Sequence, residues 1–232
     1  MSAAPRWRSI AAVNRAIVAC EHCPRLREHC AAVARNKRRA YRDHDYWGRP
    51  VPGFGDPNAR LVIVGLAPGM HGANRSGRPF TGDYAGVLLY RTLHKFGFAD
   101  RPVSISADDG LRLTGCRITN AVKCLPPENK PTGDEVRRCN GFLAKEISVL
   151  PKDSVLLALG GIAHKAVLMA ASEKIVARKF AHGARHRLQS GLTLFDSYHC
   201  SRYNTQTRRL TAAMFEQVFA DIRRHLEAPI PA

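Results

Sequence analysis

The stretch at residues 65–86, GLAPGMHGANRSGRPFTGDYAG, limits the folds open to this chain more than any other. It directly follows the apolar run at residues 61–64, which is short and rich in β-branched side chains and so predicts a buried strand. Ordinary strand-to-helix connections have about 2 to 6 residues, and longer ones are usually functional or disordered. Five glycines and two prolines precede Asp83, and glycine lets a backbone approach a ligand closely. The stretch therefore predicts a ligand-holding loop outside the carboxyl end of a strand in an α/β sheet. The alternative is a surface loop without chemistry.

Short apolar runs alternate with helical patterns along most of the chain. Strands are predicted at residues 61–64, 116–122, 155–159 and 192–198, and helices at residues 87–96, 132–147, 160–169 and 211–226. This alternation predicts an α/β fold, a three-layer α/β/α sandwich around a central four-stranded, mostly parallel sheet. We expect one domain over residues 1–232. It comprises a helical N-terminal segment at about 7–42, an ordered loop at 43–57, and an α/β core at about 58–227.

The charge balance indicates a polyanionic partner. The chain has 36 Lys and Arg against 19 Asp and Glu, a formal net charge of +17 in 232 residues. Nucleic acid is the first candidate, because cationic side chains release counterions from phosphates; a merely soluble basic surface is the alternative. No apolar run is long enough to span a membrane, and the first residues lack a signal-peptide core. We therefore expect a cytoplasmic protein without a membrane partner.

The seven cysteines indicate metal or cluster binding, because disulfides are rare in a reducing cytoplasm. Cys20 and Cys23 form a CxxC pair, and Cys124 and Cys139 stand far downstream. Four thiolates could hold a structural zinc ion or an iron–sulfur cluster, and the spacing does not decide between them. The other three cysteines are expected to be small buried hydrophobes, although the first of them could substitute as a ligand: Cys30, Cys116 and Cys200.

Three motifs follow predicted strands in order, GLAPGMHGANRSGRPFTGD, TNAVKC and HCSRYNTQT. Together they resemble the uracil-DNA glycosylase superfamily, specifically its family 5, whose members contain iron and sulfur. The resemblance extends over about residues 20–215. It implies a four-stranded parallel sheet between helices and places the four cluster ligands on Cys20, Cys23, Cys124 and Cys139, which favours a [4Fe-4S] cluster over zinc. The implied activity is removal of uracil, and in some members of hypoxanthine or xanthine, from double-stranded DNA.

Residue roles follow from the resemblance. Phe80 would stack on the extruded base, and Asn120 would read the uracil edge with its amide donor and acceptor. His199 would donate a hydrogen bond to the base oxygen where negative charge accumulates. The alternatives are an Asn120 amide that caps local backbone and a His199 ring with a structural role only.

The position of the expected catalytic carboxylate is the main difference between this chain and better-known branches of the superfamily. Those branches place a carboxylate or amide where this chain has Leu66 and Ala67. In family 5 the matching group is Asp83, which would act as a general base or as an electrostatic partner for the sugar cation. Asp83 could also simply be the N-cap of the following helix.

Other residues complete the expected site. Backbone groups of Gly65, Leu66, Ala67 and Gly69 would surround the base and water, Ser201 would contact a phosphate, and Arg202 with Tyr203 would enter the DNA helix. Further pocket or phosphate contacts are expected from His71, Asn74 and Arg78. Cys200 stands where the superfamily has proline, so the loop loses a fixed φ; because the histidine and serine remain, we expect activity to survive with altered loop mobility.

Two other functions compete with a monomeric glycosylase acting on deaminated duplex DNA. One is a non-catalytic nucleic-acid-binding protein with a structural four-cysteine metal site. The other is an iron–sulfur nuclease, which would need clustered carboxylates for metal ions. The sequence shows no such paired-acid motif.

Overall fold

A computed structural model describes residues 9–228 and is built on a six-stranded sheet of order β1-β3-β2-β4-β6-β5. The four inner strands pair in parallel. They are β2 (Leu61–Gly65), β3 (Cys116–Asn120), β4 (Val155–Leu159) and β6 (Thr193–Ser197). Every residue of these four strands is buried. β2 and β4 read as the continuous apolar runs expected of strands covered on both faces, whereas β3 and β6 mix apolar and polar residues; the sequence located all four.

The prediction of a four-stranded sheet is wrong in number, because each edge carries a further antiparallel strand. β1 (Phe54–Gly55) pairs with β3 inside the segment that was expected to be loop. β5 (Arg185–Arg187) pairs with β6 and alternates between exposed and half-buried residues. Neither short edge strand buries an apolar run, so neither has the pattern by which a strand is recognised.

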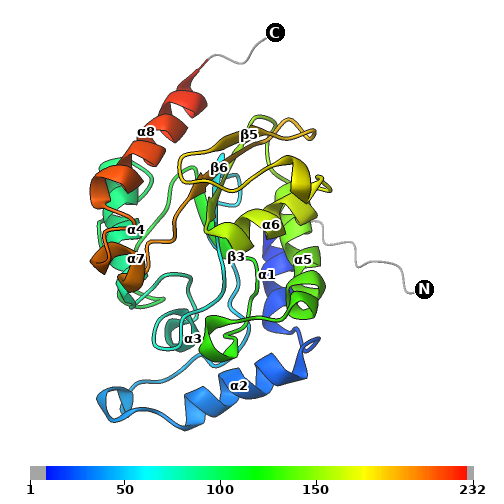
Figure 1. Cartoon of the computed structure of the whole chain (residues 1–232). Helices are drawn as coiled ribbons and strands as arrows, with labels where there is room; N and C mark the ends of the chain where they lie inside the picture. The colour runs from blue at the N-terminus through cyan, green and yellow to red at the C-terminus, as the bar shows by residue number, and fades with distance from the viewer. Residues whose placement is uncertain (1–8, 229–232) are drawn as a thin grey trace, which may run out of the picture.

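Helices cover both faces of the sheet (Figure 1). Leu61 and its same-face neighbours pack with α4 and α8, whereas Val62 and its neighbours pack with α5 and α6. Alternate residues of a strand point to opposite faces, which places one core on each side of the sheet. The covering helices are α4 (Tyr84–Lys95), α8 (Ala212–Glu227), α5 (Gly133–Ser148) and α6 (Gly161–Ala170).

Local signals fix the starts of the helices that border the site. Asp83 caps α4 through a bond from the Gly86 N–H, and Thr132 with Glu135 forms a complete capping box at α5. Gly97, at φ 71°, follows the end of α4 as expected. Short helical turns lie in the connections, namely α3 (Ala73–Ser76), α7 (Arg202–Gln206), η2 (Pro127–Asn129) and η3 (Ile175–Ala177).

The N-terminal segment is helical but interrupted. It forms α1 (Ile10–Val18), α2 (Pro24–Arg35) and the turn η1 (Arg39–Tyr41). The CxxC pair lies between the first two helices, and Pro24 opens α2, where its missing N–H costs nothing. The predicted helical residues 7 and 8 lie outside the described residues. No described helix is long and apolar enough to cross a membrane.

Candidate active site

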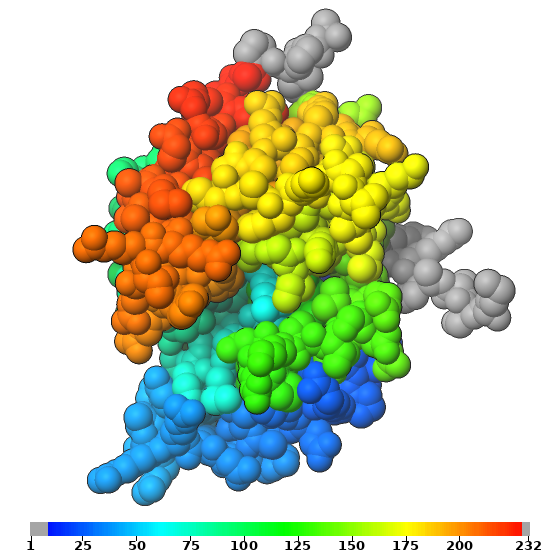
Figure 2. Space-filling model, in the orientation of Figure 1, coloured from blue at the N-terminus to red at the C-terminus, as the bar shows by residue number. Residues whose placement is uncertain are grey.

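The connections after β2, β3 and β6 meet at the carboxyl edge of the sheet and enclose a cavity of about 250 Å³. Figure 2 shows the cyan surface of the glycine-rich loop recessed between the orange segment near residue 200 and the green segment near residue 130. The cavity is lined by Leu66, Ala67, Gly69, Phe80, Asp83, Ala85, Asn129, His199 and Ser201. All but Ala85 and Asn129 were expected site residues. The predicted loop therefore lies at a cavity of small-ligand size.

Gly65 and Asn120 lie side by side next to this cavity, at the ends of β2 and β3. A Cβ atom added to Gly65 would lie 2.4 Å from Asn120 Oδ1 and 2.8 Å from the Phe80 ring. The amide and the ring therefore leave space only for glycine. Asn120 Oδ1 is buried and has no hydrogen-bond partner among the described residues. An unpaired buried acceptor costs about 1–3 kcal/mol, which a bound ligand with a matching donor would relieve.

Phe80 and His199 pair across the cavity. Their rings stack with centroids 5.7 Å apart and an interplanar angle of 27°. Phe80 adopts φ 55°, a strained backbone conformation for a bulky side chain that is typical of functional sites. Helix α4 supports this conformation, because the Tyr90 hydroxyl donates a hydrogen bond of 2.9 Å to the carbonyl of the preceding residue, Pro79. The aromatic face is thus held in position before any ligand arrives.

Burial sets the protonation state of His199. Desolvation lowers the pKa of this imidazole to about 4, because a charged ring is disfavoured away from water. The ring is therefore neutral near pH 7 and keeps one N–H donor. The side-chain amide of Asn204 donates a hydrogen bond of 2.8 Å to the His199 carbonyl and stabilises the backbone there.

Asp83 caps α4 and also faces the cavity. Its Oδ1 accepts from the Gly86 N–H at 2.9 Å as the cap of α4, and its side chain also lines the cavity. A Cβ on Gly72 would lie 2.1 Å from Asp83 Oδ2, so the glycine loop closes tightly on the carboxylate. Burial raises the pKa of Asp83, while the amides of Gly86 and Ala85 oppose that shift.

The third motif borders the cavity and the outer surface. Ser201 lines the cavity and caps α7 by accepting from the Asn204 N–H at 3.3 Å. The Arg202 guanidinium lies 5.1 Å from the ring centroid of Tyr84 and lines an adjoining groove of about 940 Å³. Tyr203 is 70% exposed. Ser201 and Arg202 therefore line the cavity and the groove that adjoins it, with the exposed Tyr203 next to them in the sequence.

The three further expected contacts, His71, Asn74 and Arg78, lie in different surroundings. His71 lines the groove, hydrogen-bonds the Tyr46 hydroxyl at 2.8 Å and stacks on Tyr41. Asn74 is fully buried in α3. The expectation for Arg78 is wrong, because its buried guanidinium pairs with Asp109 at 2.6 Å.

Sequence reasoning missed Asn129 as a cavity residue. It ends η2 with φ 57°, a conformation that asparagine tolerates better than most residues. The only signal was the turn-rich composition of residues 125–130, and it gave no indication that this turn reaches the cavity.

The four expected cysteine ligands line one small cavity of about 20 Å³, where the α1–α2 junction meets the β3–α5 connection and helix α5. They are Cys20, Cys23, Cys124 and Cys139. Cys30, Cys116 and Cys200 are buried in the cores, as expected for small hydrophobes. The Cys30 sulfur accepts from the Leu125 N–H at 3.2 Å, so its environment is that of a packed thiol beside the ligand set.

The lining of the cysteine cavity fits a metal centre held by thiolates. Arg27 lines the same cavity, and its Nε and Nη1 are buried without a partner in the described chain. The thiolates of a bound metal centre carry negative charge that would pair with this guanidinium.

A family model for the uracil DNA glycosylase superfamily matches residues 52–223, a span that includes the glycine loop, Asn120 and the His199 motif. The match covers most of the chain and the whole cavity. The chain belongs to the uracil DNA glycosylase superfamily.

Relatives specify the branch. A type-5 uracil-DNA glycosylase of Thermus thermophilus is 49% identical over 208 residues, 90% of this chain and 94% of the relative. Proteins of the same name from Mycobacterium leprae and Pyrobaculum aerophilum are 44% and 42% identical, over 93% and 89% of this chain and 95% and 88% of their own lengths. The expected resemblance to family 5 is confirmed.

Proposed function

We propose that this chain is a monofunctional uracil-DNA glycosylase, which extrudes uracil from double-stranded DNA and hydrolyses its N-glycosidic bond to begin base excision repair. The observation that carries the proposal is the buried Oδ1 of Asn120, which has no partner among the described residues and lies against Gly65, next to the cavity that Phe80, Asp83 and His199 line. The names of the type-5 relatives support the same activity.

Uracil supplies the partner that Asn120 lacks. The N3–H of uracil donates to Oδ1, while the amide nitrogen donates to the base O4. Cytosine has no proton on N3 and carries a donor at position 4, so it matches neither amide atom. Phe80 can stack on any base, whereas Asn120 selects uracil over cytosine. Extrusion costs a few kcal/mol and favours mispaired bases, which suits uracil opposite guanine.

Bond breakage separates charge. As the C1′–N1 bond breaks, the bonding electrons leave with the base and positive charge develops on the sugar. The neutral His199 ring donates a hydrogen bond to the base oxygen that becomes negative. The Asp83 carboxylate stabilises the cation and orients the water that adds to C1′. The water proton is lost to the medium, and the released base takes up a proton in return.

The mouth of the site binds DNA. Ser201 contacts a phosphate, and Arg202, which lies over Tyr84, enters the helix with the exposed Tyr203 where the base has left. The formal charge of +17 supports sequence-independent binding of the backbone. We further propose that residues 1–232 work as one domain and a cytoplasmic monomer.

The four cysteines hold a [4Fe-4S] cluster, supported by their shared cavity and by the unpaired Arg27 beside it. The four ligands would tie the α1–α2 junction to the β3–α5 connection and to α5 when the cluster is bound. Residues of that connection include Asn129 at the active-site cavity, so the cluster ligands steady one wall of the pocket.

Substrate range extends the proposal. Leu66 and Ala67 leave one wall of the cavity apolar, so excision depends on leaving-group quality and admits hypoxanthine or xanthine. Single-turnover rates on U:G, U:A and hypoxanthine:T duplexes and on single-stranded uracil test this range. Strict preference for single-stranded uracil contradicts it.

Product chemistry tests the activity itself. A glycosylase releases free uracil and leaves an intact strand that breaks only after alkali. Strand breaks without alkali support a nuclease instead. Tight DNA binding with no base release supports the non-catalytic binding protein.

A further inference from the structure

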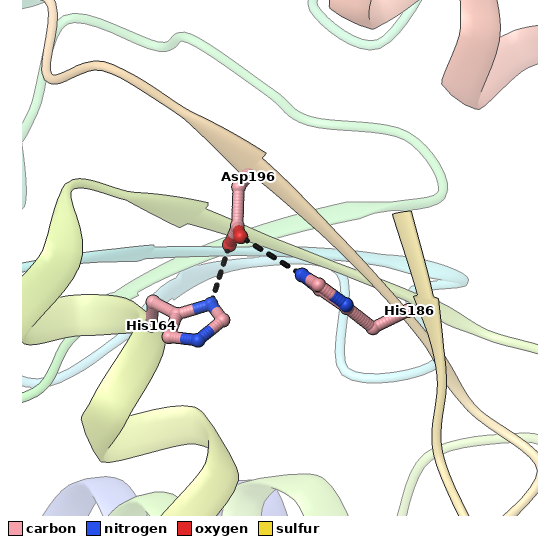
Figure 3. A group of neighbouring side chains, drawn as sticks. All are labelled: His164, His186 and Asp196. Carbon is pink, nitrogen blue, oxygen red and sulfur yellow. Dashed lines mark hydrogen bonds and ion pairs between the residues drawn. The ribbon is translucent and has the colours of Figure 1, made fainter. Parts of the chain in front are cut away.

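Three metal-ligating side chains from three elements meet beneath the sheet edge, apart from the cysteine cavity. Figure 3 shows the carboxylate of Asp196, from β6, between the rings of His164, from α6, and His186, from β5. Asp196 Oδ1 lies 2.8 Å from His164 Nδ1, and its Oδ2 lies 3.2 Å from His186 Nε2. Asp196 is fully buried and His164 is 1% exposed, so the cluster is not an exposed charge pair.

His164 is oriented as a ligand. Its Nε2 lies 2.9 Å from the backbone carbonyl of Arg178. A carbonyl can only accept, so Nε2 carries a hydrogen and Nδ1 faces the carboxylate. Metal-bound histidines almost always donate their second ring N–H in this way, which fixes the tautomer and the ring plane. Phe180 packs against the ring edge with centroids 5.8 Å apart.

The spacing suits one small divalent ion. The three ligand atoms all lie within 4.8 Å of one another. Zinc bonds of about 2.0–2.2 Å to nitrogen and oxygen place neighbouring ligands about 3.4 Å apart in a tetrahedron. The present contacts of 2.8 Å to His164 and 3.2 Å to His186 need to open by about 0.6 and 0.2 Å, respectively. The His186 side chain keeps 15% exposure, which leaves a way in for the ion and for one water ligand.

We propose that His164, His186 and Asp196 form a second metal site, which binds one divalent first-row cation of the zinc class. Two imidazoles and one carboxylate favour such a cation over magnesium, which prefers oxygen ligands. The site is independent of the proposed glycosylase activity.

The bound ion would fasten the sheet edge. β5 has three residues, pairs only with β6, and alternates exposed and half-buried side chains. Such a strand has little burial of its own to hold it. A metal bond to His186 ties β5 to α6 through His164 and to β6 through Asp196, so metal stabilises this corner of the fold.

Zinc retention tests the proposal on the cluster-loaded protein. The wild-type holoprotein is incubated with zinc chloride without oxygen and desalted, and zinc and iron per chain are then measured. The expected result is one zinc per chain with iron content unchanged. His186→Gln is expected to lose that zinc. His225→Gln is the matched control, because His225 meets β5 through Arg185 at 2.9 Å but does not belong to the three-residue cluster, so it should keep the zinc.

Thermal unfolding gives a second readout. A site occupied at about 100 times its Kd is expected to raise the wild-type Tm by roughly 5–10 °C, with no rise in His186→Gln and none from magnesium chloride. The proposal is overturned if the wild type retains no zinc, if His186→Gln retains as much, or if zinc replaces iron. The three residues would then form a purely structural ion-pair network.

Discussion

Replacing His199 by alanine tests the catalytic chemistry most sharply. The substitution removes one pre-positioned donor from the oxygen where charge develops. Loss of one such donor costs about 2.7–4 kcal/mol, or about 10²- to 10³-fold in rate. The ring also stacks on Phe80, and an aromatic pair contributes about 0.5–1.5 kcal/mol, so some stability is lost as well. His199→Gln keeps an N–H donor and should recover part of the rate.

The protonation state gives this prediction a second test. With a pKa of about 4, only about one His199 ring in a thousand is charged at pH 7. The neutral donor is therefore present throughout the range above pH 5 and is replaced by the cation only below about pH 4. The excision rate should show no dependence on His199 ionisation between pH 5 and 8. A mechanism that needed the cation would lose rate tenfold per pH unit over that range.

The assay is single-turnover excision from a U:G duplex, with DNA affinity measured on the same variants. We expect His199→Ala to lose rate and to bind DNA as the wild type does. Unchanged excision would remove His199 from the mechanism. An equal loss of rate and of DNA affinity would show that its role is structural.

Other substitutions test separate parts of the site. Gly65→Ala places a Cβ 2.4 Å from Asn120 Oδ1 and should suppress excision, whereas Gly141→Ala, with nothing within 4 Å, should leave excision unchanged and stabilise α5 by about 0.5–1 kcal/mol. Asp83→Asn keeps a good N-cap, so Tm should hold while single-turnover excision falls about 10²-fold or more; an unchanged rate would leave Asp83 as a cap alone. Cys124→Ser should lower bound iron and visible absorbance, and Cys116→Ser, in the core, should retain both; equal iron in the two variants would contradict the ligand assignment.

The sequence predicted those parts of the fold in which burial of side chains requires a recognisable apolar pattern. β2 and β4 are continuous apolar runs because helices cover both of their faces. β5 reads Arg-His-Arg, since an edge strand needs no apolar face, and it was missed. The N-terminal helical pattern was correct in type, but Pro24 starts a second helix after the CxxC pair.

The site was predictable where motifs mark it and not where folding alone assembles it. Gly65, Phe80 and His199 lie together as their motifs indicated. Arg78 pairs with Asp109, a loop carboxylate distant in sequence, and no local sequence pattern predicts this pairing. Asp196 sits within a strand that reads as ordinary core, so its meeting with His164 became visible only in three dimensions.

The most direct measurement is release of free uracil from a duplex with one U:G pair, using protein purified without oxygen, followed by alkali. We predict uracil release and strand cleavage that depends on alkali. Asn120→Ala, which removes two hydrogen bonds of about 1 kcal/mol each, should slow release roughly 30-fold with iron content unchanged. No release from the wild type, or equal release from Asn120→Ala, would contradict the assignment of the cavity as a uracil pocket.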